Sequence, residues 1–293
     1  MKLAIQVITH HSSKHLAPLL ESLKAQTFQE FEMWFLDNSE NRDEAELSRA
    51  QVVSSGLRHT FIVNETNTGF AGGHQAMFLS HEAPFVMLLN DDATLAPEYL
   101  ERVMRRIESD PKIGSITGLV LRSDGVTIDT TGLEYKCLAQ IVDRFAGCQM
   151  SNVRSQMYSE EVFGVSGAIG LYRRSAVEKA GGLFGPKWFM YKEDVDLALR
   201  LRNAGFVSWF EPEAIAWHAR GVKAGSSHAK RPVILRKSSY VNQWRVYRRH
   251  WKGTSFGDKL RSIGFELLRS AHLLIMAPKI FFEAWRELLS SVF

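Results

Sequence analysis

The segment from Val86 to Thr94 constrains the fold of this chain more than any other. Its apolar residues lead directly into Asn90, Asp91 and Asp92, as in a short strand buried in a parallel sheet. Ligands of α/β proteins lie at the carboxyl ends of such strands. Two adjacent carboxylates repel each other unless a cation or a donor lies between them, and Mg²⁺ and Mn²⁺ prefer oxygen ligands. The segment alone fits two interpretations equally well: a metal site, or a polar loop in which one of the two acids caps a helix starting near Pro97.

Strand-like and helix-like segments alternate on both sides of this segment, which predicts an α/β fold with a mostly parallel central sheet. The first, second and fourth strands end in polar residues, so their tips are expected to line one crevice. Residues 122–162 suggest hairpins or a long loop over the site. The expected strands are 3–8, 31–36, 61–63, 85–89, 113–121, 164–171, 207–210 and 214–218, and the expected helices include 16–23, 43–54, 75–80, 98–107, 173–180 and 193–204.

Composition is that of an ordinary globular protein, with 293 residues, 45% hydrophobic and 23% charged. Only two cysteines are present, Cys137 and Cys148, which excludes a disulfide framework and favours a reduced, cytoplasmic protein. The N-terminal apolar run is too short for a signal peptide, and no apolar run approaches the roughly 20 residues of a transmembrane helix.

Two further strand ends carry candidate ligand contacts. Asp37 could accept hydrogen bonds from a nucleotide base or ribose, or it could form an Asx-turn with the residues that follow. The glycines at 69, 72 and 73 have the wrong spacing and place for a dinucleotide fingerprint, which disfavours a dinucleotide-dependent oxidoreductase. A tight turn near a ligand or a helix start explains them better.

Three acids open the helix expected at 193–204, close to the aromatic Trp188. Glu193 and Asp194 suggest a general base at the edge of a sugar-sized pocket. The alternative is an acidic first turn in which one of them caps the helix, because the helix dipole favours negative charge there. His218 follows an apolar strand and is either a packed histidine or a ligand.

Taken in order, these pieces resemble glycosyltransferase family 2, inverting enzymes with the GT-A fold. The resemblance covers residues 3 to about 220 and is strongest to the bacterial rhamnosyltransferase-type members, which build cell-wall and other surface polysaccharides. The motifs that carry it lie at 7–10 with 16–28, 36–39, 67–73, 88–92, 164–174, 193–196 and 217–218.

The resemblance implies a role for each matching residue. Asp92 and His218 would bind Mn²⁺ or Mg²⁺, and Asp194, with Glu193 beside it, would deprotonate the acceptor. The expected contacts to the nucleotide-sugar are Thr9, Asp37, Asn67, Gly69, Gly73, Asp91, Gly167 and Trp188. The sequence departs from the family at Asn90, which replaces a leading Asp, and at His74 and Gln75, where an Asn is common.

The resemblance also implies the substrates. The donor would be a nucleotide-sugar, dTDP-rhamnose or a UDP-hexose, and the acceptor a saccharide that is lipid-linked. A catalytically silent nucleotide- or glycan-binding module with the same fold is the competing interpretation.

The C-terminal part is basic. No acidic residue lies between Ala214 and Gly257, where bases alternate with aromatic residues. Two amphipathic helices are expected at 260–275 and 281–289. Their apolar faces could pack on the catalytic domain, form a homodimer, or bind an anionic membrane at the inner face of the plasma membrane. Some bases at 220–237 could reach the donor diphosphate, and no signature of nucleic-acid binding accompanies them. The expected division is a catalytic domain at 1–220 and a helical region at 221–293.

Overall fold

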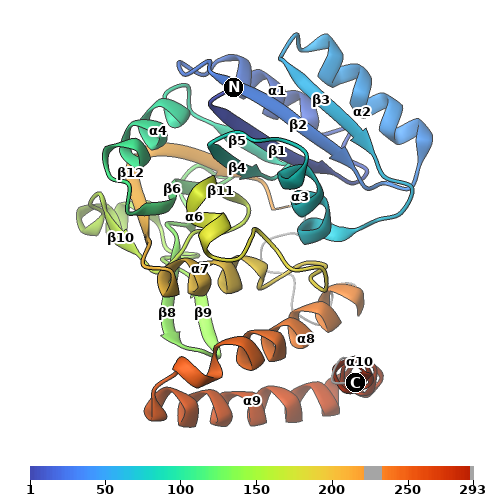
Figure 1. Ribbon diagram of the computed structural model, residues 1–293, viewed down its shortest axis with the longest axis vertical. Coiled ribbons are helices and arrows are strands. Elements are labelled where there is room, and N and C mark those ends of the chain that lie inside the picture. The colour runs from blue at the N-terminus through green and yellow to red at the C-terminus, as the bar shows by residue number, and fades with distance from the viewer. Residues whose placement is uncertain (221–232, 291–293) are drawn as a thin grey trace.

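The computed structural model describes residues 1–220 and 233–290. A ten-stranded sheet runs through its centre in the order β10-β12-β6-β11-β4-β1-β2-β3, with β5 paired to β12 and β7 to β6. Figure 1 shows this sheet with helices on both sides. The strands of this sheet are β1 (Leu3–Thr9), β2 (Phe31–Asp37), β3 (His59–Val63), β4 (Phe85–Leu89), β5 (Ala93–Leu95), β6 (Ile113–Arg122), β7 (Ile128–Thr130), β10 (Glu160–Val162), β11 (Ile169–Arg173) and β12 (Val207–His218).

The α/β fold class is confirmed, and the sheet is mixed. Pairing is parallel from β3 through β2 and β1 to β4, whereas β11 runs antiparallel to both β4 and β6. A separate hairpin is formed by β8 (Leu133–Cys137) and β9 (Gln140–Asp143). The helices are α1 (Leu16–Lys24), α2 (Arg42–Ser54), α3 (Gly69–Leu79), α4 (Tyr99–Ser109), α5 (Met150–Val153), α6 (Arg174–Lys179), α7 (Glu193–Asn203), α8 (Val233–His250), α9 (Phe256–Met276) and α10 (Pro278–Ser290), with short 3₁₀ turns at Arg154–Gln156 and Trp251–Gly253.

The central strand β4 is buried on both faces, as its continuous apolar run predicts. Met87 and Leu89 pack with α1, α2 and α4 on one side of the sheet. Val86 and Leu88 pack with α3, α6, α7 and α8 on the other. This double cover fixes β4, so the polar residues that follow it leave the core at a defined point.

One strand replaces the two that were predicted at 207–210 and 214–218. β12 is continuous and bends through an irregularity between Glu211 and Ile215. Its last residues pair with β5, which the sequence did not reveal, and His218 lies opposite Ala93. This pairing brings the end of β12 beside the end of β4.

Other predicted boundaries shift. The helix expected at 75–80 begins at Gly69, and the strand expected at 164–171 begins at Ile169. The helix expected at 193–204 ends at Asn203, and Ala204 at its C-cap is exposed. The helix after Pro97 has Glu98 at its N-cap, so Asp91 and Asp92 do not cap it.

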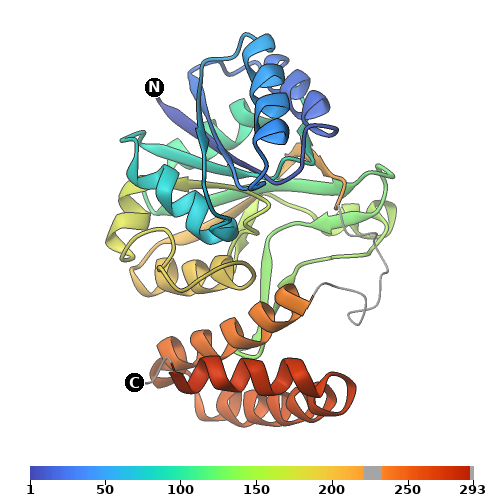
Figure 2. The same cartoon turned by 90° about the vertical axis from the view of Figure 1, so that its right-hand side faces the viewer.

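Three C-terminal helices lie together at the end of the molecule away from α1 and α2 (Figures 1 and 2). The two predicted helices are confirmed as α9 and α10, and α8 was not predicted. α8 packs on α7, and the β8–β9 hairpin reaches α9 through Tyr135, whose hydroxyl donates to Asp258 at 3.0 Å. Within the described ranges, no helix has the length and apolar character to cross a bilayer. The basic positions 223, 230 and 231 lie outside the described residues, and the predicted division at 220 stays a prediction.

Candidate active site

The tips of β1 and β2 meet at Thr9 and Asp37. The Thr9 hydroxyl donates to Asp37 Oδ2 at 2.7 Å, and Asp37 Oδ1 accepts from the backbone N–H of Ser39 at 3.0 Å. The second bond is the Asx-turn that the sequence offered as an alternative. Asp37 is therefore a buried carboxylate whose two oxygens both accept hydrogen bonds, and its contact with a nucleotide stays a prediction.

The two acids after β4 have different surroundings. Asp91 accepts a hydrogen bond from the hydroxyl of Ser12, in the turn after β1. Asp92 Oδ1 lies 3.1 Å from His218 Nε2, at the end of β12. The side-chain amide of Asn90 also lies 3.1 Å from His218 Nε2. The predicted metal ligands Asp92 and His218 are thus brought together.

A buried residue outside every predicted motif orients the imidazole. Asp129 Oδ2, on β7, lies 2.9 Å from His218 Nδ1. Burial alone would lower the pKa of His218, but its hydrogen bonds and ion pairs with Asp129 and Asp92 raise that pKa to about 9. Asp129 also pairs with Arg220, which reaches Asp143 Oδ2 at 3.5 Å.

Asp92 and His218 fit a divalent cation. The Asp129 carboxylate holds one imidazole nitrogen, as in many metal sites, and a metal bound at the other nitrogen would displace the proton that the raised pKa places there. Within 1–220 and 233–290 no group of three or more His, Cys, Asp or Glu side chains could hold a metal by itself. Two protein ligands suit a metal that takes its remaining oxygens from substrate phosphates and water.

Asp194 lies at the first turn of α7. Its Oδ2 accepts from the backbone N–H of Gly167 at 3.2 Å, and its Oδ1 accepts from the N–H of Val195 at 2.8 Å. The helix N-cap is Lys192, without a side-chain cap, so the cap alternative for Glu193 and Asp194 is wrong.

The environments of these two carboxyl groups differ. Burial and the neighbouring charge of Asp194 raise the pKa of Glu193 far above its ordinary value, and its Oε2 has no hydrogen-bond partner among the described residues. Burial also raises the pKa of Asp194, but two backbone N–H groups favour its charged form. Glu193 therefore holds a proton more readily, and Asp194 is the better base.

The metal-side and base-side residues are joined by one short segment. Gly167 donates to Asp194, and the carbonyl of the next residue, Ala168, accepts from the backbone N–H of Asn90 at 2.9 Å. Burial, and second the charge of Asp194, raise the pKa of Asp143 to about 6. Asp143 pairs with Arg220, which pairs with Asp129 beside His218. The two clusters thus border one region.

The glycine segment supports the loop before α7. Gly69 has φ +72°, and a Cβ there would meet the carbonyl of Phe189 at 2.4 Å. Ala71 donates to that same carbonyl at 3.0 Å, while Asn67 accepts from the N–H of Gly69 at 2.8 Å. A Cβ at Gly73 would meet Ile8 at 2.7 Å, because α3 lies close to β1.

The remaining predicted contact, Trp188, lies deeper, as do two of the residues that depart from the family pattern. Trp188 is buried next to Gly185 and lines a hollow with arginines of α8. His74 is buried beside Gln6, and Gln75 accepts from the N–H of Phe184 at 2.9 Å. These two of the three residues that depart from the family pattern therefore serve internal packing.

Helix α8 holds the start of α7 in place. The side-chain amide of Asn242 donates to the carbonyls of Met190 and Tyr191 at 2.9 and 2.8 Å. Tyr191 and Lys192 have φ of 71° and 70°, which non-glycine residues rarely adopt. Sequence reasoning missed Asn242 and Asp129, because neither belongs to a motif and both act through contacts distant along the chain.

The fold and a family match define the class of this protein. A family model described as glycosyl transferase family 2 matches residues 4–181, more than half of the chain. The chain belongs to glycosyltransferase family 2, as its motifs predicted.

Curated relatives include rhamnosyl-transferring enzymes. An N-acetylglucosaminyl-diphospho-decaprenol L-rhamnosyltransferase of Mycobacterium tuberculosis is 28% identical over 166 residues, 54% of this chain and 54% of the relative. An uncharacterized glycosyltransferase of Haemophilus influenzae is 27% identical over 164 residues, 53% of this chain and 54% of its own length. The chain spans about half the length of the curated relatives it matches.

Solved glycosyltransferases share the fold at low identity. GalNAc-T7 with UDP, GalNAc and Mn²⁺ has a TM-score of 0.63 at 14% identity, over 85% of this chain and 48% of that one. TarS of S. aureus with UDP-GlcNAc has a TM-score of 0.61 at 16% identity, over 84% of this chain and 66% of that one. A mannosyltransferase of Pyrobaculum calidifontis with GDP-Man and Mn²⁺ has a TM-score of 0.55 at 14% identity, over 98% of this chain and 87% of that one. These likenesses confirm the GT-A fold.

Proposed function

We propose that this protein is an inverting, metal-dependent hexosyltransferase that moves a sugar from a nucleotide-sugar to a saccharide acceptor. The observation that carries the proposal is the connection of Asp92 and His218 to Asp194 through Gly167 and Ala168. One bound donor can then meet metal ligands at its diphosphate and a base near its anomeric carbon.

On the donor side, Asp92 and His218 would hold Mn²⁺ or Mg²⁺. A bound divalent ion neutralises the diphosphate that must leave. Asp129 keeps the His218 ring in place, and Asn90 lies beside the same nitrogen. Solved proteins of this fold with Mn²⁺ beside UDP or GDP-Man support the assignment. Thr9, Asp37 and Asp91 line the strand tips where the nucleotide would lie.

On the acceptor side, Asp194 takes the proton of the attacking hydroxyl. It is held by two backbone N–H groups, so its lone pairs have a fixed direction. General bases of this kind contribute about 10²–10⁴-fold to the rate. Attack from the face opposite the leaving diphosphate inverts the anomeric centre.

The substrates follow from similarity to the mycobacterial enzyme, whose name gives an L-rhamnosyl donor and a diphospho-decaprenol acceptor. We infer a dTDP-rhamnose donor, with UDP-hexoses as the next candidates, and a lipid-linked saccharide acceptor in cell-surface polysaccharide synthesis. A cytoplasmic location at the inner face of the plasma membrane and a homodimer through the C-terminal helices stay predictions.

A nucleotide-sugar panel tests the proposal. In thermal-shift measurements with Mn²⁺, we expect dTDP-rhamnose or a UDP-hexose to raise the melting temperature more than the free sugars do. Purified protein should then transfer or hydrolyse that donor, lose this activity in excess chelator, and regain it with added Mn²⁺ or Mg²⁺. Donor binding without transfer or hydrolysis would instead indicate a silent binding module. Full activity in excess chelator would contradict the metal.

A further inference from the structure

Helix α9 turns its polar side toward the protein and its apolar side outward. Ser262 and Glu266 face the hairpin and α8 and are 1% and 5% exposed, whereas Leu268 and Ile275 are 74% and 77% exposed. A helix that packs its apolar face inward shows the opposite pattern. The outer face of α9 also exposes Phe256, Leu260, Leu267 and Met276. Contiguous apolar surface of this kind marks an interaction site.

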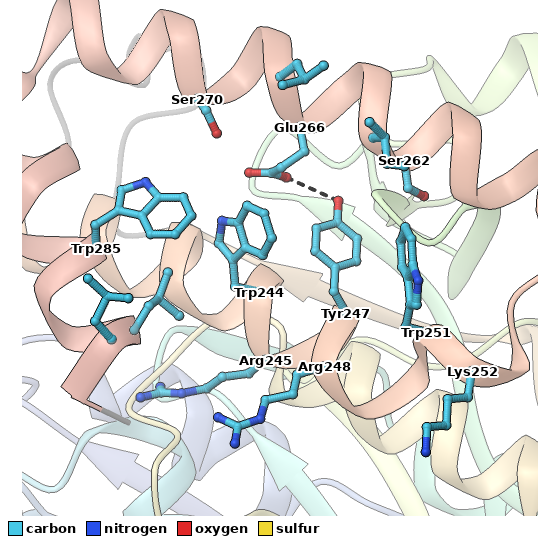
Figure 3. Close-up of a pocket in the computed structure, with 14 residues that line it drawn as sticks. Trp244, Arg245, Tyr247, Arg248, Trp251, Lys252, Ser262, Glu266, Ser270 and Trp285 are labelled. Carbon is cyan, nitrogen blue, oxygen red and sulfur yellow. Dashed lines mark hydrogen bonds between the residues drawn. The ribbon is translucent and has the colours of Figure 1, made fainter. Parts of the chain in front are cut away.

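An aromatic groove of about 810 Å³ opens between α8, α9 and α10. Figure 3 shows Trp285, Trp244, Tyr247 and Trp251 in a row beneath α9. The indole N–H groups of Trp244 and Trp285 are buried and have no hydrogen-bond partner in the part of the chain that is described. A volume near the upper end of the usual range, about 300–1,000 Å³, suits a long hydrocarbon chain.

A basic stripe runs beside the aromatic row. Arg245, Arg248 and Lys252 each follow one of the rings Trp244, Tyr247 and Trp251 by one position, and all three also line the groove. Arg245 is already paired with Glu287 of α10 at 3.0 Å, and Figure 3 shows the three basic side chains projecting away from α9. Arg245 and Arg248 also line a second hollow of about 390 Å³ with Lys187 and Arg249. Residues 233–290 contain 11 lysines and arginines against 4 acids, in a chain whose total formal charge is only +4.

We propose that α8, α9 and α10 form a docking surface for an anionic lipid bilayer. The outer face of α9 enters the interface, the aromatic groove receives a lipid hydrocarbon chain, and the basic stripe of α8 binds the lipid phosphate. Amphipathic helices with aromatic and basic residues bind anionic interfaces in this way. Tryptophan suits the boundary, because its ring is apolar and its N–H needs an acceptor.

The charge of the surface favours lipid over a second copy of the chain. A two-fold interface brings the same patch of both copies together, so the basic stripes would approach each other. Like charges across an interface disfavour association, whereas lipid phosphates complement them. The proposal concerns binding alone and does not require the proposed transfer reaction.

Vesicle flotation tests the docking surface. The full chain should float with vesicles of phosphatidylcholine and phosphatidylglycerol and bind phosphatidylcholine vesicles far less. Leu268→Glu with Ile275→Glu should lower the partition coefficient by about 100-fold or more, since each replaces an exposed apolar side chain that would become buried in the bilayer. Arg248→Gln with Lys252→Gln should lower it by about 30-fold, at about five-fold per charge. The exposed α3 variant Leu79→Glu is the matched control and should float normally.

A second measurement locates the lipid chain. Vesicles whose acyl chains carry bromine should quench the tryptophan fluorescence, and Trp285→Phe should reduce the quenched fraction. Bound protein whose fluorescence is not quenched would contradict a chain in the groove.

Two outcomes would overturn the docking surface itself. One is protein that stays at the bottom with anionic vesicles, and the other is a Leu268→Glu, Ile275→Glu variant that floats as well as the wild type. Sedimentation velocity distinguishes a lipid bilayer from a second copy of the chain. If the wild type does not bind vesicles but forms a dimer that the double variant dissociates, the face belongs to a second copy. Protein that floats but transfers no sugar would contradict the proposed function and leave the docking surface standing.

Discussion

His218 Nε2 lies 3.1 Å from Asp92 Oδ1, although Asp92 lies in the turn between β4 and β5 and His218 ends β12, far along the chain. The contact depends on β5, a short strand that pairs with the last residues of β12 and sets His218 opposite Ala93. It also depends on Asp129, which lies against the other nitrogen of the ring. The proposed metal site is thus built from three segments that only the folded sheet brings together.

Asp129→Asn should weaken metal binding although it replaces neither of the two proposed metal ligands. A carboxylate that orients a metal-binding histidine contributes about 10–100-fold to metal affinity. We expect a loss of that size in titrations of Mn²⁺ into protein with bound UDP or dTDP. Asp43→Asn, in the exposed first turn of α2, is the control and should bind as the wild type does. Equal affinities for all three proteins would contradict the role of Asp129.

Gly69→Ala should destabilise the protein more than Gly56→Ala. The two glycines have nearly equal φ, +72° and +73°, so both substitutions incur the same backbone strain, roughly 1–2 kcal/mol. A Cβ at Gly56 meets nothing within 4 Å, but at Gly69 it meets the carbonyl of Phe189 at 2.4 Å. Overpacking adds about 1–3 kcal/mol. Urea unfolding measures the free energy of unfolding of both variants. Equal losses of stability would contradict the prediction, because the loop at Phe189 would then move aside at no cost.

Asn242→Ala should slow the transfer reaction, because Asn242 holds the turn that leads into α7 and Asp194. It removes two hydrogen bonds to the backbone turn before Asp194, which should cost about 1–3 kcal/mol of stability and misplace the base. Gln243→Ala is the matched control, because Gln243 is also buried but donates to Leu138 in the hairpin. We expect similar stability losses in the two variants. The rate should fall about 10-fold or more in Asn242→Ala alone, since small misplacements of catalytic groups have large effects.

If Gln243→Ala slowed the reaction as much as Asn242→Ala, the effect would come from general loosening of the C-terminal helices. Donor affinity distinguishes a misplaced base from a damaged donor site. If only the base is misplaced, Asn242→Ala leaves the dissociation constant of the donor unchanged.

Glu193→Gln should change how stability depends on pH. Burial raises the pKa of Glu193 in the folded protein, so the folded state holds a proton that the unfolded chain has lost. Stability therefore falls as pH rises from the ordinary glutamate pKa, about 4.3, toward the raised folded value. Urea unfolding at a series of pH values should show this decline in the wild type and a flatter profile in Glu193→Gln. The exposed variant Glu65→Gln should keep the wild-type decline, and an identical slope in Glu193→Gln would contradict a neutral, buried Glu193.

The sequence was informative where a single segment carries its own signal. The apolar run before Asn90 predicted a buried strand, and the spacing of Leu16, Leu19 and Leu23 predicted α1. The polar ends of β1 and β2 were expected to meet, and Thr9 and Asp37 do. The order of motifs also predicted the family and the fold.

What the sequence left open depends on contacts between distant segments. Asp129 lies in a stretch without clear periodicity, and only its pairing with β6 brings it to His218. The apolar spacing of α9 predicted an amphipathic helix but left open whether its apolar face packs on the catalytic domain, on a second copy or on a membrane. In the structure the buried residues of α9 are Ser262 and Glu266. Periodicity shows that a helix has two faces and does not show which one turns inward.

The proposal that Asp194 acts as the base beside a metal held by Asp92 and His218 is tested most directly by Asp194→Asn. The variant should bind the donor with an unchanged dissociation constant and transfer the sugar about 10²–10⁴-fold more slowly than the wild type. Isothermal titration with the nucleotide-sugar and a single-turnover transfer assay give the two numbers. Turnover near the wild-type rate would show that Asp194 is not the base and would contradict the account.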